Sequence, residues 1–180
     1  IGVVAAMTIP MLISKIQKAQ IETQIRENYS SIYQTMKMAE NDEVGAINSL
    51  GVSLSSNKKW FETFLAPYMK FEQVCYSTGG CWHKYGVVKT LNAKAPTYET
   101  KVRETDSLRG YVGVALAFRT AKGAYFDIDT SSAGSTKNAF GVDATGNTIQ
   151  FYVDLNGDKK PNFIGKDIYI LIYDSENGLV

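Results

Sequence analysis

Hydrophobic and polar positions follow a helical period at the N-terminal end of the chain. Residues 1–40 contain a single proline, Pro10, and no glycine after Gly2, so they predict one long helix that is kinked near its start. The first thirteen residues, IGVVAAMTIPMLI, carry no charge. Apolar residues then recur three or four positions apart and form one stripe, made of Ile21, Ile25, Tyr29, Ile32, Met36 and Ala39.

The period changes to two in the C-terminal part. Four segments rich in Val, Ile, Tyr and Phe are separated by Gly, Asn, Asp or Ser: YVGVALAF, AYFDID, TIQFYVDL and DIYILIY. They predict an antiparallel β-sheet of about four strands. Such a sheet has one face to cover, and the amphipathic stripe of the long helix is the expected cover, which gives an α+β fold.

Three regions are therefore expected along the chain. Residues 1–20 form a projecting apolar helix, because forty helical residues measure about 60 Å, roughly twice the diameter of a small domain. Residues 21–180 form a globular domain with helix 21–40, an irregular region 41–110 and the sheet 111–180. Within the irregular region, WFETFLAPYMK predicts a short helix capped by Ser56 or Asn57.

The composition is that of one folded domain. Of 180 residues, 44% are hydrophobic and 21% are charged, which excludes an intrinsically disordered chain. The net charge of +1 means that bulk charge predicts neither nucleic-acid binding nor attraction to an anionic membrane. The sequence starts at Ile1 without an initiator Met, so we expect a processed or incomplete N-terminus; about a dozen apolar residues upstream would complete a membrane span.

Signatures of catalysis are scarce. His83 is the single histidine, so a catalytic triad or a zinc site with several histidines would have to be built around one residue. The motifs G-x-S-x-G, H-E-x-x-H, G-x-x-x-x-G-K-[ST] and G-x-G-x-x-G are all absent. We expect no enzyme activity; a secreted hydrolase would need acidic residues clustered in a cleft.

Cys75 and Cys81 bracket the segment YSTGG, whose glycines permit a tight reversal that brings two thiols within disulfide distance. A disulfide is the expected state, and it indicates an oxidising compartment. The alternative is a metal site formed by Cys75, Cys81 and His83, although it lacks a fourth ligand and the usual C-x-x-C spacing.

Oxygen donors alternate along DLNGDKKPNFIGKD, the segment that joins the last two predicted strands. This arrangement is typical of calcium ligands, and the candidate set is Asp154, Asn156, Asp158, Asn162 and Asp167. The segment is not an EF-hand, because glycine stands at its fourth position rather than its sixth, and Gly165 replaces the bidentate glutamate. The alternative is a polar connecting loop with no metal.

Two segments carry a resemblance to a known family. IGVVAAMTIP followed by a long amphipathic helix resembles the N-terminal region of type IV pilins and type II secretion pseudopilins, and Pro10 matches the helix-kinking proline of that family. DLNGDKKPNFIGKDIY resembles the C-terminal loop of pseudopilin-like proteins, in which related loops can hold calcium. The matches cover the first forty and the last thirty residues.

The resemblance implies a structural function without an active site. A prepilin peptidase would remove a leader, the apolar helix would wait in the inner membrane, and a machine driven by a cytoplasmic ATPase would extract the subunit into a helical filament. The filament would lie at the surface of a bacterial or archaeal cell, with the globular part periplasmic or extracellular. Neighbouring copies would bury Ile1, Val3, Val4, Met7, Ile9, Pro10, Leu12, Ile13 and Ile16.

The pattern leaves a second class of function open. A bare apolar helix end needs lipid, detergent or other copies of the chain, and it can serve as a simple anchor. The alternative to a filament subunit is therefore a membrane-anchored monomer that binds calcium or adheres, or a minor pseudopilin. No cofactor is required by either hypothesis, and Ca²⁺ is the only candidate.

Overall fold

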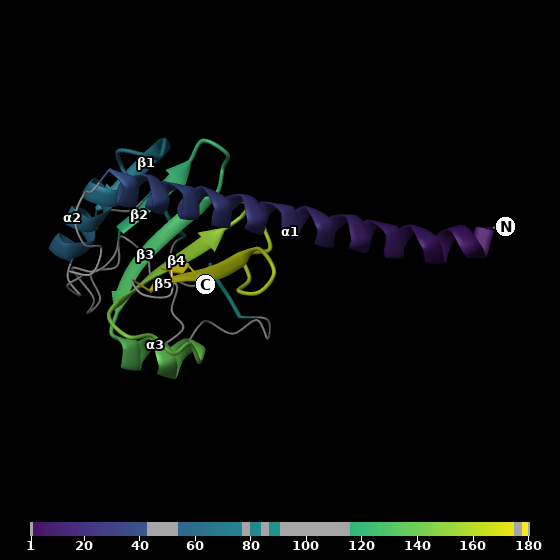
Figure 1. Ribbon diagram of the computed structural model, residues 1–180. Coiled ribbons are helices and arrows are strands. Elements are labelled where there is room, and N and C mark those ends of the chain that lie inside the picture. The colour runs from purple at the N-terminus through teal and green to yellow at the C-terminus, as the bar shows by residue number, and fades with distance from the viewer. Residues whose placement is uncertain are drawn as a thin grey trace.

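A long helix extends from an α+β domain in the computed structural model of the chain (Figure 1). The structure describes residues 2–42, 54–76, 80–83, 87–90, 116–174 and 178–179, with side chains from Lys15 onward. The helices are α1 (Gly2–Asn41), α2 (Leu54–Phe64) and α3 (Ala133–Phe140). The strands are β1 (Phe71–Tyr76), β2 (Leu116–Thr120), β3 (Tyr125–Ser131), β4 (Thr148–Asp154), β5 (Ile168–Asp174) and β6 (Gly178–Leu179).

The strands form one antiparallel meander in the order β1-β2-β3-β4-β5-β6. The α+β class is confirmed, but the sheet has six strands rather than about four. The four segments with a period of two contain β2, β3, β4 and β5, although residues 111–115 of the first segment lie outside the described residues. The two additional strands lie at the two edges of the sheet.

The edge strands lack the alternation that marks the inner four. In β1 both Glu72 and Gln73 are exposed, and the register shifts between Phe71 and Gln73. Strand β6 is two residues long and pairs only with Tyr173 and Asp174. An edge strand pairs with a neighbouring strand on one side only and tolerates such irregularity. A search for alternating hydrophobic residues therefore misses it.

The two helices after α1 also differ from expectation. Helix α2 begins at Leu54, before the predicted caps, and Asn57 is a buried residue whose side chain accepts a hydrogen bond from Thr130 on β3 at 3.0 Å. Helix α3 was not predicted; Ser132 caps its start by accepting from the backbone N–H of Ser135. Gly141 ends it in the left-handed conformation.

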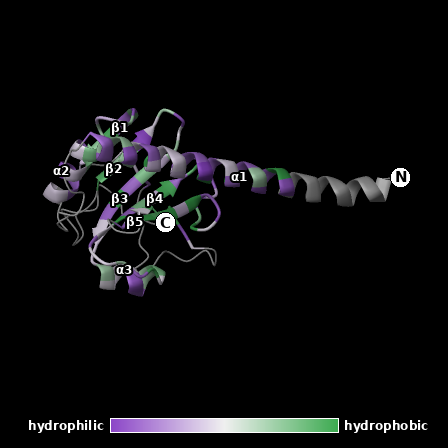
Figure 2. Ribbon diagram, viewed as in Figure 1, coloured by the Kyte–Doolittle hydropathy of each residue, from purple (hydrophilic) through white to green (hydrophobic). Residues whose placement is uncertain are grey.

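One face of the sheet carries the apolar core. The stripe of α1 packs there as predicted, with Ile32, Met36 and Ala39 at 0–2% exposure, and α2 lies beside it. In the centre, the rings of Phe118 and Phe126 stack with centroids 4.7 Å apart. Figure 2 shows hydrophobic residues along β4 and β5 and hydrophilic residues along much of β3.

The opposite face of the sheet is buried too, which the sequence analysis did not expect. Alternate residues of the strands place polar side chains there, and Asp127, Asp129 and Gln150 are all at least 95% buried. Helix α3 covers part of this face, since Thr136 lies 2.6 Å from Thr148, hydroxyl to hydroxyl. A second, smaller apolar cluster that includes Trp82, Tyr152 and Ile168 is buried beside these polar groups. The sheet is therefore a layer between an apolar side and a side that mixes polar and apolar groups, which we call the polar face.

Candidate functional site

The N-terminal half of α1 is the first candidate site. The helix runs through Pro10 without interruption and leaves the domain as a free rod (Figure 1). Residues 15–20 are all exposed, and the side chain of Ile16 is 49% accessible. Of the residues predicted to pack between copies, only Ile16 belongs to those whose side chains are described; the others are Ile1, Val3, Val4, Met7, Ile9, Pro10, Leu12 and Ile13.

Cover from the domain begins at Ile21. Ile21, Ile25 and Tyr29 pack partly against the core, and the Tyr29 hydroxyl donates to the carbonyl of Leu179 on β6 at 3.0 Å. The helical segment from Gly2 to residue 20, which precedes this cover, is thus roughly 30 Å long. Within the described part of the chain, no helix contains an apolar stretch long enough to cross a membrane.

The second candidate site is the loop between β4 and β5. The disulfide segment lies against the start of this loop. The predicted disulfide joins Cys75 of β1 to Cys81, with Cα atoms 5.9 Å apart. Because both sulfurs are bonded to each other, the alternative metal site with His83 is excluded. The bridge instead holds Trp82 and His83 over the polar face of the sheet, where both are buried.

His83 makes the central contact of this site. Its Nε2 lies 2.6 Å from Oδ2 of Asp154, and the two side chains are 4% and 0% exposed. The other carboxylate oxygen of Asp154 accepts the backbone N–H groups of Asn156 and Gly157, each at 2.9 Å. Asp154 therefore shapes the start of the loop and anchors the disulfide segment to the sheet.

Gly157 lets the loop close over β3. Its φ of +64° lies in the left-handed region, and a Cβ atom there would meet the carbonyl oxygen of Gly123 at 2.8 Å. The same turn places Asp158 beside Tyr125, whose hydroxyl donates to Oδ2 of Asp158 at 2.7 Å. Burial, reinforced by this hydrogen bond, raises the pKa of Tyr125 to about 12.

Asp167 organises the end of the loop. Its Oδ2 accepts the backbone N–H of Asn162 at 2.7 Å and the side-chain amide of Asn156 at 3.3 Å, while its Oδ1 accepts the backbone N–H of Phe163 at 2.7 Å. Two oxygens beside it, Oδ1 of Asn156 and Oδ1 of Asn162, are buried without a hydrogen-bond partner. Buried amide oxygens of this kind usually have a partner.

The five predicted calcium ligands divide into three groups. Asp154 faces His83, Asp158 faces Tyr125, and Asp167 lies with Asn156 and Asn162. Among the described residues, no three His, Cys, Asp or Glu side chains are placed to hold a metal ion together. A single five-ligand site does not fit this geometry, and what remains for Ca²⁺ is the set of Asp167 and the two asparagines.

A groove of about 1080 Å³ connects the two candidate sites. Its walls come from α1 between Ile16 and Gln24, from the β4–β5 loop, including Pro161 and Lys166, and from Tyr169 at the start of β5. Both the helix and the loop that form these walls could be singled out from the sequence, but their closeness in space could not. The pairing of His83 with Asp154 was missed as well, because 71 residues separate them; the D-x-N-G turn after β4 is the one local signal for it.

Comparison of the chain with family models, with curated proteins and with solved structures found no match.

Proposed function

We propose that this chain is a structural subunit of a type IV pilus-like filament or a type II secretion pseudopilus, and that it polymerises through its N-terminal apolar helix. One observation carries the proposal. Helix α1 is continuous over Gly2–Asn41, its residues 15–20 are all exposed, and contact with the core of its own domain is described from Ile21 onward. A rod of this kind, with thirteen uncharged residues at its end, requires another apolar surface.

Copies of the chain can supply that surface. Packing the rods side by side removes apolar area from water at roughly 25 cal/mol per Å², so many copies give a cohesive filament core. The contact is heterologous, because each rod meets different parts of its neighbours, and a heterologous contact that does not close produces an open helical polymer. The globular domain, which the Cys75–Cys81 disulfide braces locally, then forms the outside of the filament.

This function implies partners other than copies of the chain. A prepilin peptidase would process the subunit, the inner membrane would hold it before assembly, and machinery driven by a cytoplasmic ATPase would extract it. The finished filament would lie on the surface of a bacterial or archaeal cell. Pilus and pseudopilus share this architecture and differ in what the filament does once it is built.

The test is electron microscopy of material sheared from producing cells, with mass spectrometry to identify the filament subunit. Wild-type cells should yield filaments made of this chain. Ile16→Lys should abolish them, because an ammonium group buried between rods loses hydration worth several kcal/mol without a partner. Ile16 is 49% exposed in the subunit, so the variant should fold and retain its melting temperature.

Val87→Lys is the matched control, since Val87 is 41% exposed and lies away from α1 in the chain. This variant should form filaments at the wild-type level. Wild-type protein recovered only as a membrane-bound monomer would contradict the filament and favour an anchored binding module. Equal loss of filaments in both variants would show that Ile16 has no special place in the contact.

A second candidate role, calcium-dependent stabilisation of the domain, is favoured by the two unpartnered amide oxygens beside Asp167. A cation there would be held by Asp167, Asn156 and Asn162 and would satisfy oxygens that otherwise lack partners. Stabilisation by a ligand grows as RT ln(1 + [L]/Kd), about 2.7 kcal/mol at a hundred times Kd. Ca²⁺ should therefore raise the melting temperature relative to chelator-treated protein.

The calcium role is tested with the variant Asn156→Ala, and Asp143→Ala is its matched control. The first removes an unpartnered oxygen beside Asp167 and should reduce the calcium-dependent shift. The second removes an exposed carboxylate on the α3 side of the domain and should leave the shift intact. Identical melting curves with Ca²⁺ and with chelator would exclude the role.

A further inference from the structure

The exposed lysines of the described residues are unevenly distributed, although the net charge of the chain is only +1. Five of them belong to the part of α1 that leaves the domain or to the β4–β5 loop that shares a groove with it, and we call this group the basic rim: Lys15, Lys18, Lys159, Lys160 and Lys166. Lys18 and Lys166 line the same groove from its two walls. Lys159 and Lys160 precede Pro161, which lines it as well.

Few carboxylates balance the basic rim. Glu22 is bound to Arg26 at 2.9 Å, Asp167 is buried and accepts loop N–H groups, and Asp158 accepts the Tyr125 hydroxyl. None of the five lysines takes part in the ion pairs found among the described residues. The rim therefore presents a local excess of positive charge around the base of the rod.

The position of the basic rim along α1 indicates that its lysines would face a membrane surface. Residues 1–14 are uncharged, and Lys15 is the first ionisable side chain of the sequence. If the uncharged end enters a bilayer, Lys15 and Lys18 lie at the depth of the headgroups, and the β4–β5 loop beside them faces the same plane (Figure 1). Long lysine side chains reach such a surface easily.

We propose that the basic rim binds anionic phospholipid headgroups and holds the base of the domain against the bilayer before assembly. The inference rests on the membrane stage of the proposed function. A Lys ammonium near an anionic bilayer adds about a five-fold preference, so several lysines together give strong and salt-sensitive binding. The rim thus adds electrostatic binding to the burial of the apolar helix end in the bilayer.

Charge argues against a second copy as the occupant. Exposed carboxylates of the described residues are largely paired within the chain, as Glu27 is with Lys122 and Glu62 with Lys58. Among the described residues, no three acidic side chains lie close enough together to hold a metal ion. An anionic bilayer offers the dense negative charge that these surfaces lack.

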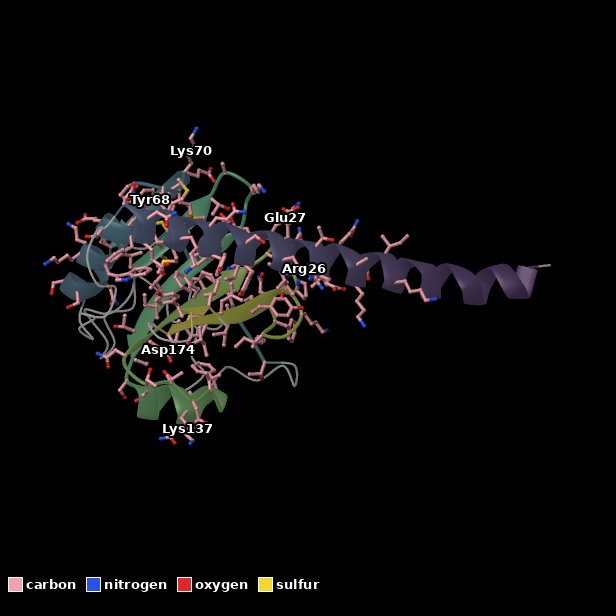
Figure 3. All side chains as sticks on the ribbon, in the orientation of Figure 1. Arg26, Glu27, Tyr68, Lys70, Lys137 and Asp174 are labelled. Carbon is pink, nitrogen blue, oxygen red and sulfur yellow. A yellow bond between two sulfur atoms is a disulfide. The ribbon has the colours of Figure 1, made fainter. Side chains whose placement is uncertain are left out.

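The test uses the full chain and vesicles of phosphatidylcholine, alone or with about one-quarter phosphatidylglycerol, in a flotation assay at ~0.15 M salt. The probe variant is Lys159→Gln, Lys160→Gln and Lys166→Gln. The matched control, Lys58→Gln, Lys59→Gln and Lys137→Gln, removes the same charge from α2 and α3, away from the rod (Figures 1 and 3). All six lysines are exposed, so both variants should fold.

Wild type and control should prefer the anionic vesicles, and the probe variant should lose about 100-fold of that preference. Salt at about 1 M should erase the difference between them. Equal affinity of the wild type for both vesicles, or equal loss in probe and control, would overturn the proposal. Filaments lost in the probe variant without a vesicle preference in the wild type would instead assign the rim to contacts between copies.

The outcomes separate this proposal from the filament. Filaments in sheared material together with no preference for phosphatidylglycerol would reject the rim and leave the proposed function standing. A charge-dependent preference in a protein that never polymerises would support the rim and reject the filament.

Discussion

The two faces of the sheet are both buried, but they are held in different ways. The face under α1 and α2 is a continuous apolar layer in which aromatic rings pack against one another. The other face places carboxylates, amides and a histidine where water is excluded, and Asp154 there is 0% exposed. The first face gains its stability from buried apolar area, whereas the second combines a smaller apolar cluster with hydrogen bonds between buried polar groups, so equivalent substitutions should affect them differently.

The largest expected effect is on the apolar face. Phe118→Ala removes a fully buried ring that lies 4.7 Å from Phe126 and 5.6 Å from Phe61, centroid to centroid. It should lower the free energy of unfolding by about 3–5 kcal/mol, because the neighbouring strands cannot collapse into the cavity. Denaturant titration measures the change. Phe118→Leu is the control and should cost clearly less; equal losses would mean that the face is loosely packed.

A smaller effect is expected on the polar face. Asp154→Ala leaves His83 and the N–H groups of Asn156 and Gly157 without their acceptor, and we expect a loss of about 2–3 kcal/mol. Asp154→Asn keeps an acceptor for the two N–H groups, and its amide N–H can donate to Nε2 of His83 once the ring proton moves to Nδ1, so it should recover much of the loss. The double variant with His83→Phe should cost less than the sum of the single changes.

Additive losses in that double variant would show that the two side chains act independently, despite the 2.6 Å separation of their polar atoms. Such a result would remove the distinction between the faces. A loss in Asp154→Asn equal to that in Asp154→Ala would show instead that the charge matters and the hydrogen-bond geometry does not.

The apolar face could be predicted from the sequence, since its determinants are local. The spacing of Ile32, Met36 and Ala39 fixes one side of α1, and the period of two fixes the inward residues of β3, β4 and β5. The boundaries of β3, β4 and β5 follow within two residues, because Gly, Asn and Asp interrupt the alternation, whereas β2 extends to Thr120, beyond the predicted segment. Of the six strands, only β1 and β6 were not predicted, because these edge strands have little hydrophobic alternation.

The polar face could not be predicted, because its determinants are distant in sequence. Asp127, Asp129 and Gln150 occupy the alternate positions that normally face water, and nothing local indicates that they are covered. The calcium prediction shares this limit, because spacing in DLNGDKKPNFIGKD places oxygens along the chain but does not show which groups surround them. Two of the five predicted ligands have protein partners: Asp154 lies against His83, and Asp158 accepts the hydroxyl of Tyr125.

The smallest expected effect is a loss of folding stability at alkaline pH. It can be compared for one tyrosine from each face. Burial raises the pKa of Tyr125 on the polar face and of Tyr173 on the apolar face from 10.0 to about 12. A phenol with a raised folded-state pKa contributes stability that is fully present below pH 10 and is lost as the pH rises towards about 12. Denaturant midpoints across this window, with phenolate absorbance, measure the loss.

Tyr125→Phe and Tyr173→Phe should each flatten part of that alkaline decline. The hydrogen bond to Asp158 contributes to the shift of Tyr125, whereas burial is the first cause for both residues and the charges of Glu40 and Asp174 add to it at Tyr173. Asp158→Ala should therefore reduce the late titration of Tyr125 and leave Tyr173 unchanged. A wild-type stability that stays constant between pH 10 and about 12 would contradict the burial of both phenols, and with it the view that the sheet is closed on its two sides.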